Sequence, residues 1–218
     1  MDIAFDIETI PNSGMIDRLP PVEVKAGNLK DPAKIAEKEA AAKAEQIDKM
    51  ALSPLYGRVC AWVSQSDKIC NSLCCDCITA DSDAEETRVI ENAFKALSGG
   101  RVITYNGNGF DLPFLYRRAV LLGIDPRRWS MPTLAEMTAR YNNKRHVDLM
   151  QVWCGFGQFE KLDNIAGAIL DDHKIEIDFR DFPEMIKTIE GRDKLLAYCH
   201  QDVSLTKKLW NRISGILI

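Results

Sequence analysis

The sequence lacks several features that would assign it to a broad class of protein. Its 218 residues include no apolar run of about 18 residues, so we expect no membrane-spanning helix and no membrane partner. It has no basic excess, because 28 Lys and Arg stand against 32 Asp and Glu, so any nucleic-acid surface must be local. The N-terminal residues MDIAFDIETI lack a basic region and a cleavage site, so no signal peptide is expected. Seven cysteines without an export signal favour a reducing compartment, expected to be the cytoplasm of a bacterial or phage-infected cell.

The apolar pattern instead predicts strands and helices in a definite order, without an internal repeat or a low-complexity linker. A period of two predicts a strand over residues 2–9, and a hairpin of strands 57–65 and 68–78 across Ser66-Asp67. The elements expected next are helix 83–97, strand 101–105, helix 111–122, strand 146–149, and helices 161–170 and 192–213. This order indicates one α/β domain over residues 1–218, a mixed sheet flanked by helices as in the RNase H-like fold.

Residues 22–50 interrupt this order and are predicted to form a helical insertion. Asp31 suits a helix N-cap, and Pro32 suits the first helical turn. Five lysines stand against five acidic residues between Lys30 and Lys49, so the segment carries no net charge. A solvent-exposed helix is the favoured interpretation, and a flap over a substrate is the alternative.

Two carboxylates lie two residues apart in the first predicted strand. Side chains at positions i and i+2 share one face of a strand, so Asp6 and Glu8 are expected about 7 Å apart. Like charges at that distance repel by about 2–3 kcal/mol at an effective dielectric constant of about 20. A bound cation would reverse the sign of this energy. A half-exposed strand with a solvated polar face is the alternative for this pair.

Two further segments place an acid where it needs a partner. Asp111 opens a predicted helix after a glycine-rich turn, so it either caps the helix or belongs to a functional loop with Asn106 and Phe110. Tyr198 and Asp202 are four residues apart on the apolar stripe of the last helix. An inward-facing Asp there requires either a hydrogen-bonded core partner or a metal ion.

Together, these three segments resemble the motifs of a known enzyme family. The motifs are FDIET at residues 5–9, N-x-x-x-F-D from Asn106 to Asp111, and Y-x-x-x-D from Tyr198 to Asp202. They are similar, in order and rough spacing, to those of DEDD-type 3′–5′ exonucleases of the tyrosine subclass. The histidine subclass would need His where this chain has Ala197. The resemblance is strongest to the proofreading exonuclease domain of family B DNA polymerases, in its stand-alone bacterial and phage version.

The resemblance implies a metal-dependent hydrolase that removes nucleoside monophosphates from the 3′ end of DNA, with a single-stranded end expected. It implies two divalent cations, Mg²⁺ or Mn²⁺, at a set of four carboxylates, namely Asp6, Glu8, Asp111 and Asp202. It also implies that Tyr198 orients the attacking water. The implied substrate contacts are the backbone of Thr9 and Ile10 and the side chains of Asn106 and Phe110. A catalytically silent nucleic-acid-binding module and a 3′–5′ exoribonuclease are the alternatives, and a separate polymerase or a replication or repair protein is a candidate partner.

A local excess of basic residues follows the second motif. Between positions 117 and 145 the chain carries Arg117, Arg118, Arg127, Arg128, Arg140, Lys144 and Arg145, opposed only by Asp125 and Glu136. Because Trp129 and Tyr141 are interleaved, this segment suits a single-stranded phosphate backbone with stacked bases. Surface helices with exposed arginines are the alternative. Lys161 and Lys174 are further candidates for facing phosphate.

Four cysteines fall within eight residues, at Cys70, Cys74, Cys75 and Cys77. Their spacing is not a common zinc-ligand pattern, and a strand would send them to both faces. Small residues that fill a strand are therefore favoured over a zinc site.

Overall fold

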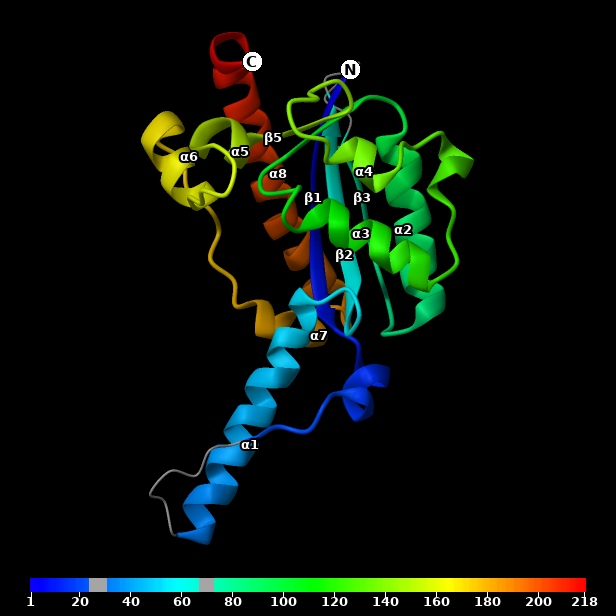
Figure 1. Cartoon of the computed structure of the whole chain (residues 1–218), viewed down its shortest axis with the longest axis vertical. Helices are drawn as coiled ribbons and strands as arrows, with labels where there is room; N and C mark the ends of the chain where they lie inside the picture. Colours follow the sequence, from blue (N-terminus) through cyan, green and yellow to red (C-terminus); the bar gives the residue numbers. More distant parts are fainter. Residues whose placement is uncertain (24–30, 67–72) are drawn as a thin grey trace.

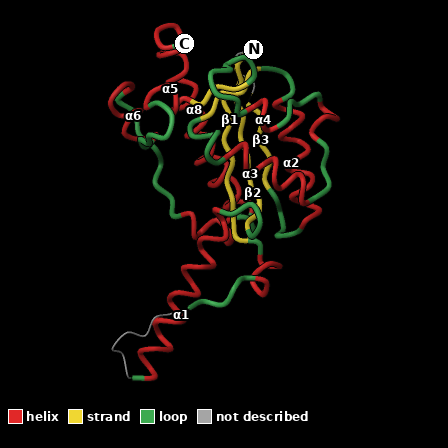
Figure 2. Tube along the Cα trace, in the orientation of Figure 1, coloured by secondary structure: helices red, strands yellow, loops and turns green. Residues whose placement is uncertain are grey.

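The computed structural model describes residues 1–23, 31–66 and 73–218, and a five-stranded mixed sheet forms its centre (Figure 1; Figure 2). The strands are β1 (Asp2–Pro11), β2 (Gly57–Ser66), β3 (Leu73–Cys77), β4 (Arg101–Thr104) and β5 (His146–Asp148), in the spatial order β3-β2-β1-β4-β5. The β1–β2 and β2–β3 pairs are antiparallel, and the β1–β4 and β4–β5 pairs are parallel. This arrangement confirms the predicted mixed sheet.

Helices cover both faces of this sheet. They are α1 (Pro32–Asp48), α2 (Asp83–Leu97), α3 (Asp111–Leu121), α4 (Leu134–Met137), α5 (Leu149–Cys154), α6 (Leu162–Leu170), α7 (Phe182–Met185) and α8 (Ile189–Leu217). Short 3₁₀ segments are η1 (Ser13–Arg18), η2 (Lys49–Leu52), η3 (Pro126–Trp129) and η4 (Phe179–Asp181). Side chains at the N-caps set several starts, because the Ser82 hydroxyl accepts from Glu85 N and the Thr188 hydroxyl accepts from Gly191 N.

The alternation of β1 decides which residues meet which helices. Ile3, Phe5 and Ile7 belong to a buried cluster that also contains residues of α2 and α3. Ala4 faces the other way and packs with Cys199 and Val203 of α8. Since side chains two apart share a face, Asp6 and Glu8 extend from the same side of β1 as Ala4, toward α8.

The parallel pairing of β1 with β4 is short, so part of β1 lies next to the loop that follows β4 instead of next to β4 itself. Pairing runs from Asp2 opposite Arg101 to Ala4 opposite Ile103. The part of β1 from Phe5 onward therefore extends past the carboxyl end of β4. Loops gather at such strand ends in sheets of this kind.

Helix α1 extends away from the sheet and buries none of its residues (Figure 1). Its N-cap is Asp31, whose carboxylate accepts from Ala33 N. The structure thus confirms a helix within the segment 22–50, and residues 24–30 lie outside the described ranges. In the expected hairpin, the turn residue Asp67 and the start of the second strand also lie outside them. Across the described ranges, no helix combines the length and the hydrophobicity needed to span a bilayer.

Candidate active site

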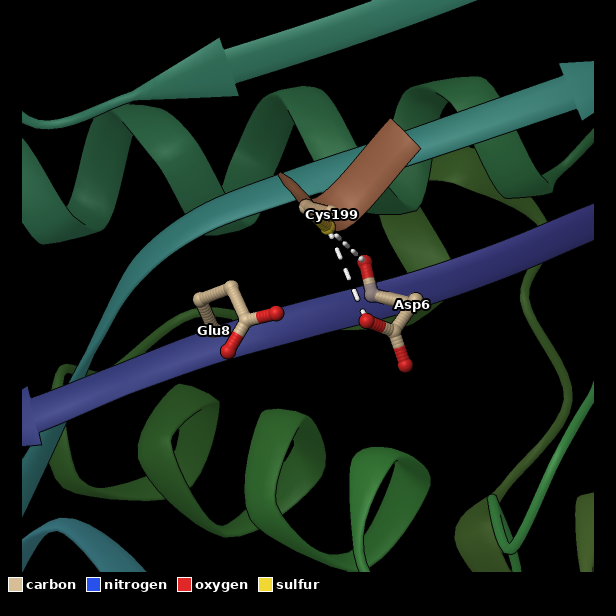
Figure 3. Close-up of side chains that lie close together, drawn as sticks. All are labelled: Asp6, Glu8 and Cys199. Carbon is tan, nitrogen blue, oxygen red and sulfur yellow. Dashed lines mark hydrogen bonds between the residues drawn. The ribbon is translucent and has the colours of Figure 1, made fainter. Parts of the chain in front are cut away.

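Asp6 and Glu8 lie on β1 with the thiol of Cys199 beside them (Figure 3). One ligand atom from each of these three residues lies within 4.8 Å of the other two. Cys199 is fully buried on α8, and its Sγ lies 3.6 Å from Asp6 Oδ2 and 3.7 Å from the Asp6 carbonyl oxygen. No sequence motif pointed to Cys199, so its position against the acids is a finding of the structure.

Asp111 reaches the same place from the other side of β1. It is buried at the start of α3, and Ile7 N donates to its Oδ1 over 3.3 Å. That amide lies beyond the last β1–β4 pair, so a side chain completes the bonding of the strand where the sheet does not. Asp111 therefore does more than begin a helix, because it binds the backbone amide of the residue that directly follows Asp6.

The loop before Asp111 is held by Asp148, at the end of β5. The Asp148 carboxylate accepts from Asn106 N and Asn108 N, each over 2.9 Å. Asn106 has a left-handed backbone with φ of 67°. A Cβ on Gly107 would lie 2.1 Å from Thr104 Oγ1, so only glycine fits at that position. This fixed turn sets the direction in which Asp111 enters α3.

Tyr198 and Asp202 come from α8, as the helical spacing predicts. Asp202 is 6% exposed, and its Oδ2 lies 2.5 Å from Lys174 Nζ. Its Oδ1 is buried and has no hydrogen-bond partner among the described residues. The Tyr198 ring packs against Phe182, with centroids 5.8 Å apart, and Lys174 Nζ lies 5.4 Å from the Tyr198 ring. Lys174, expected only to face phosphate, is thus the direct partner of a site acid.

The four acids repel one another in a poorly solvated space. Burial, then Asp111, Glu8 and Asp202, raise the pKa of Asp6 well above its usual range. Burial and Asp202 likewise raise the pKa of Glu8, and burial raises the pKa of Asp202 despite Lys174. Burial raises the pKa of Asp111 to about 7. The cluster is therefore short of positive charge, as a cation-binding site is before it binds.

The polar neighbours respond to these same acids. Burial alone would lower the pKa of Lys174, but Asp202 raises it overall, so Lys174 stays an ammonium. Burial, then Glu8 and Asp202, raise the pKa of Tyr198 to about 12, so its hydroxyl stays neutral at physiological pH. Burial and Asp6 also raise the pKa of the Cys199 thiol.

The donor set fits divalent cations. Asp6, Glu8, Asp111 and Asp202 offer carboxylate oxygens, the ligands that Mg²⁺ and Mn²⁺ prefer. The unpartnered Oδ1 of Asp202 and the mutual repulsion of the acids are the features that a bound cation would satisfy. These residues are therefore the ones that would hold metal ions.

The residues expected to contact substrate do not all line the same cleft. Lys161 and Lys174 line one cleft of about 770 Å³ together with Tyr198 and Arg180. Phe110 is partly buried, its ring 5.4 Å from the ring of Phe114. Three further residues lie outside this cleft. The Thr9 hydroxyl donates to Ala51 O over 2.7 Å, and Ile10 is buried. Asn106 lies in the loop before α3.

The basic segment divides into separate groups. Arg118 is buried, and its guanidinium donates to both carboxylate oxygens of Glu86 over 2.8 and 2.6 Å. This corrects the expectation for Arg118, because a guanidinium held by a buried carboxylate is closed to phosphate. Arg117, Lys144 and Arg145 are exposed, as are Arg127, which pairs with Asp125, and Arg128, which lies 4.0 Å from Glu91. Arg140 lies over the ring of Phe156.

The cysteine segment gives no metal-ligand group in the part of the chain that the structure describes. Cys74 and Cys75 are exposed and Cys77 is buried, all on β3, and Cys70 lies outside the described residues. The group found among described residues is Asp6, Glu8 and Cys199. Thiols that fill and flank a strand remain the interpretation for β3.

The mixed sheet with its helices on both faces defines an RNase H-like α/β domain, with acids from β1, α3 and α8 converging beside β1. A sequence profile matches residues 55–216 and describes predicted 3′–5′ exonucleases related to the exonuclease domain of PolB. The chain belongs to this family. The DEDD-type motifs of the sequence are consistent with that membership.

Comparison with individual proteins gives the same relationship at greater distance. The chain is 29% identical over 118 residues to DNA polymerase 1 of Saccharolobus solfataricus, covering 50% of this chain and 13% of that protein. It is 31% identical over 117 residues to the DNA polymerase of Pyrococcus glycovorans, covering 50% of this chain and 15% of that one. The family B DNA polymerase structure from Pyrobaculum calidifontis superimposes with a TM-score of 0.65 at 19% identity, over 97% of this chain and 24% of the polymerase. The chain therefore spans a small fraction of these relatives.

Proposed function

We propose that the chain is a divalent-cation-dependent 3′–5′ exonuclease that hydrolyses the terminal phosphodiester bond of a DNA strand and releases nucleoside monophosphates. The whole chain would act as one exonuclease domain, with residues 22–50 as an insertion. A single-stranded 3′ end is the proposed substrate. A separate polymerase or repair protein is the proposed partner.

The observation that carries the proposal is the convergence of four carboxylates from three distant segments. Asp111 binds the amide next to Asp6, Asp202 raises the pKa of Glu8, and one oxygen of Asp202 lacks a partner among the described residues. Burying four carboxylates, with Lys174 as the ion-pair partner of one of them, is costly, and a fold has little reason to do so without a ligand. Family membership supports the same chemistry.

The chain's own residues would divide the work of hydrolysis. Asp6, Glu8, Asp111 and Asp202 would hold the cations, which when bound supply Lewis-acid charge at the scissile phosphate. Tyr198 would orient the attacking water through its neutral hydroxyl, because a phenol whose pKa is about 12 is a poor base.

Two lysines would serve the phosphate backbone. Lys174 would release Asp202 to an incoming cation and turn toward phosphate in the cleft that it shares with Lys161. Lys174 lies against Asp202, and Lys161 lines the same cleft, so both ammonium groups could steer a nucleic-acid end without carrying the chemistry.

The direct test follows a 5′-labelled single strand with Mg²⁺ or Mn²⁺. We expect a ladder of shortened products that is lost in Asp202→Asn and retained in Asp193→Asn, an exposed position on the same helix. A ladder that persists at equal rate in Asp202→Asn would refute the proposed site.

The same assay separates the proposal from its alternatives. DNA and RNA strands of one sequence are compared side by side, since the sequence offers no feature that excludes the ribose 2′-hydroxyl. Faster degradation of RNA would assign an exoribonuclease. Binding of the strand without any cleavage in either cation would assign a silent nucleic-acid-binding module.

A further inference from the structure

The acid site contains a sulfur ligand that the proposed exonuclease does not use. Cys199 Sγ lies 3.6 Å from Asp6 Oδ2, and the ligand atoms of Asp6, Glu8 and Cys199 lie within 4.8 Å of one another (Figure 3). Two ligands on a tetrahedral zinc ion, with ordinary Zn–S and Zn–O bond lengths, are about 3.6 Å apart. The Asp6–Cys199 pair therefore already has the separation that zinc requires, and Glu8 needs only a small side-chain adjustment.

A fourth ligand is available on the same helix. Asp202 lies three residues after Cys199, so both side chains project from one face of α8. Its buried Oδ1 has no hydrogen-bond partner among the described residues, and its charge raises the pKa of Glu8. Asp202 also acts electrostatically on Asp6, so its unpartnered oxygen is a second sign, besides the ligand distances, that this space takes a cation.

The ligand chemistry distinguishes one cation from another. Mg²⁺ takes hard oxygen ligands and gains little from sulfur, whereas Zn²⁺ binds thiolate, carboxylate and imidazole together. Zinc also exceeds magnesium and manganese in general affinity for mixed donor sets. Its binding would replace the thiol proton of Cys199, which leaves to solvent.

We propose that Asp6, Glu8 and Cys199 form a carboxylate–thiolate site for Zn²⁺, with Asp202 as the fourth ligand. Zinc held there occupies three acids of the proposed nuclease site, Asp6, Glu8 and Asp202, so it inhibits where magnesium or manganese would activate. The proposal requires the acid cluster and the thiol, and it does not require that the chain cleaves DNA.

The test measures zinc binding to the full chain without nucleic acid. Because exposed thiols also bind zinc, the background carries Cys70, Cys74 and Cys75 replaced by serine. We expect one zinc ion per chain in competition with a chromophoric chelator, and a Kd that weakens by roughly tenfold or more in Cys199→Ser. The matched control Cys154→Ser, on α5, leaves the zinc Kd unchanged. Equal zinc Kd values in all three proteins would overturn the proposal.

A second measurement avoids dependence on how well the Cys199 variant folds. Zinc-edge X-ray absorption of the background protein is expected to report one sulfur neighbour at about 2.3 Å, with oxygen neighbours completing the shell. A shell without sulfur would overturn the thiolate site. The proposed exonuclease is judged by DNA cleavage alone, and the zinc site by zinc binding alone. One proposal can therefore be refuted while the other holds.

Discussion

Lys174 Nζ lies 2.5 Å from Asp202 Oδ2, while the other oxygen of that carboxylate is buried without a partner among the described residues. The lysine thus neutralises one oxygen of Asp202, while the negative charge of Asp202 still raises the pKa of Glu8. The two side chains differ in exposure, at 28% for Lys174 and 8% for Asp202, so the pair is only partly shielded from solvent. The Lys174 ammonium is a positive charge beside the cluster of four carboxylates, and it partly substitutes for a bound cation.

Removing that ammonium should destabilise the protein when no divalent cation is present. We expect Lys174→Met to lower the free energy of unfolding in a chelating buffer by about 1–3 kcal/mol, because Asp202 is left buried beside Glu8. The control is Lys208→Met, which breaks a pair with Asp172 at 2.6 Å in a more exposed place and should cost less than about 1 kcal/mol. Urea unfolding measures both. Equal losses would show that the Lys174 pair has no special role.

Removing one of the repelling acids should do the opposite. Asp6→Asn is expected to raise the melting temperature in chelator by about 2–4 °C, because it relieves repulsion by Asp111 and Glu8. With Mg²⁺ added, wild type should gain stability and the variant little. Asp193→Asn serves as the exposed control. An Asp6→Asn variant that melts below wild type in chelator would contradict the electrostatic account.

The stability of the metal-free protein should also depend on pH through Asp111. Its folded pKa is raised to about 7 from 3.8, so the folded state binds a proton more tightly than the unfolded state. That contribution is present below the unfolded pKa and is lost as pH rises through about 7. Cations compete with the same proton, so stabilisation by Mg²⁺ should grow from about pH 6 to about pH 8.

Thermal melts across that pH range, with and without Mg²⁺, measure the effect. Asp111→Asn keeps an oxygen for Ile7 N but cannot titrate, so its melting temperature in chelator should vary less with pH. A pH profile identical to that of wild type would assign the dependence to other groups.

The fold was predictable where local chemistry and periodicity agree. The strand at the N-terminus, the helix capped by Asp31 and the helix that begins at Asp111 were all read from alternation and caps. The last helix is longer than predicted, Ile189–Leu217 against 192–213, because it begins at the Thr188 N-cap and continues for four residues past Ile213. The short helices α4 and α7 carry too few residues for a periodic signal.

The candidate site was predictable where acids recur in motifs, and not where the contact is tertiary. The sequence indicated Asp6 because it lies two residues from another acid, Asp111 because it begins a helix after a glycine-rich turn, and Asp202 because it lies on an apolar stripe. The pairing of Lys174 with Asp202 joins an irregular segment to a helix 28 residues later, and no spacing rule reports it. The burial of Arg118 likewise depends on Glu86, which lies on a different helix.

That buried pair makes Arg118 and its neighbour Arg117 a matched test of structure against DNA binding. Arg118→Gln should lower the free energy of unfolding by about 2–4 kcal/mol, since Glu86 then keeps Arg58 as an ion-pair partner and the Val59 amide as a donor but loses the Arg118 guanidinium. Arg117→Gln, at an exposed position, should leave stability unchanged. If Arg117 contacts phosphate, its variant should reduce the slope of log affinity against log salt by about 1. Unchanged salt dependence would remove Arg117 from the DNA surface.

Tyr198 provides the sharpest test of how the proposed site treats water. Tyr198→Phe keeps the ring that packs on Phe182 and lies near Lys174, and it removes only the hydroxyl. If the hydroxyl positions water, kcat should fall by about ten- to a hundredfold, while the Mg²⁺ concentration for half-maximal activity and the melting temperature stay close to wild type. Single-turnover cleavage of a labelled strand over a Mg²⁺ series measures both quantities. A variant that needs far more Mg²⁺ but reaches the wild-type rate would instead make Tyr198 part of cation binding.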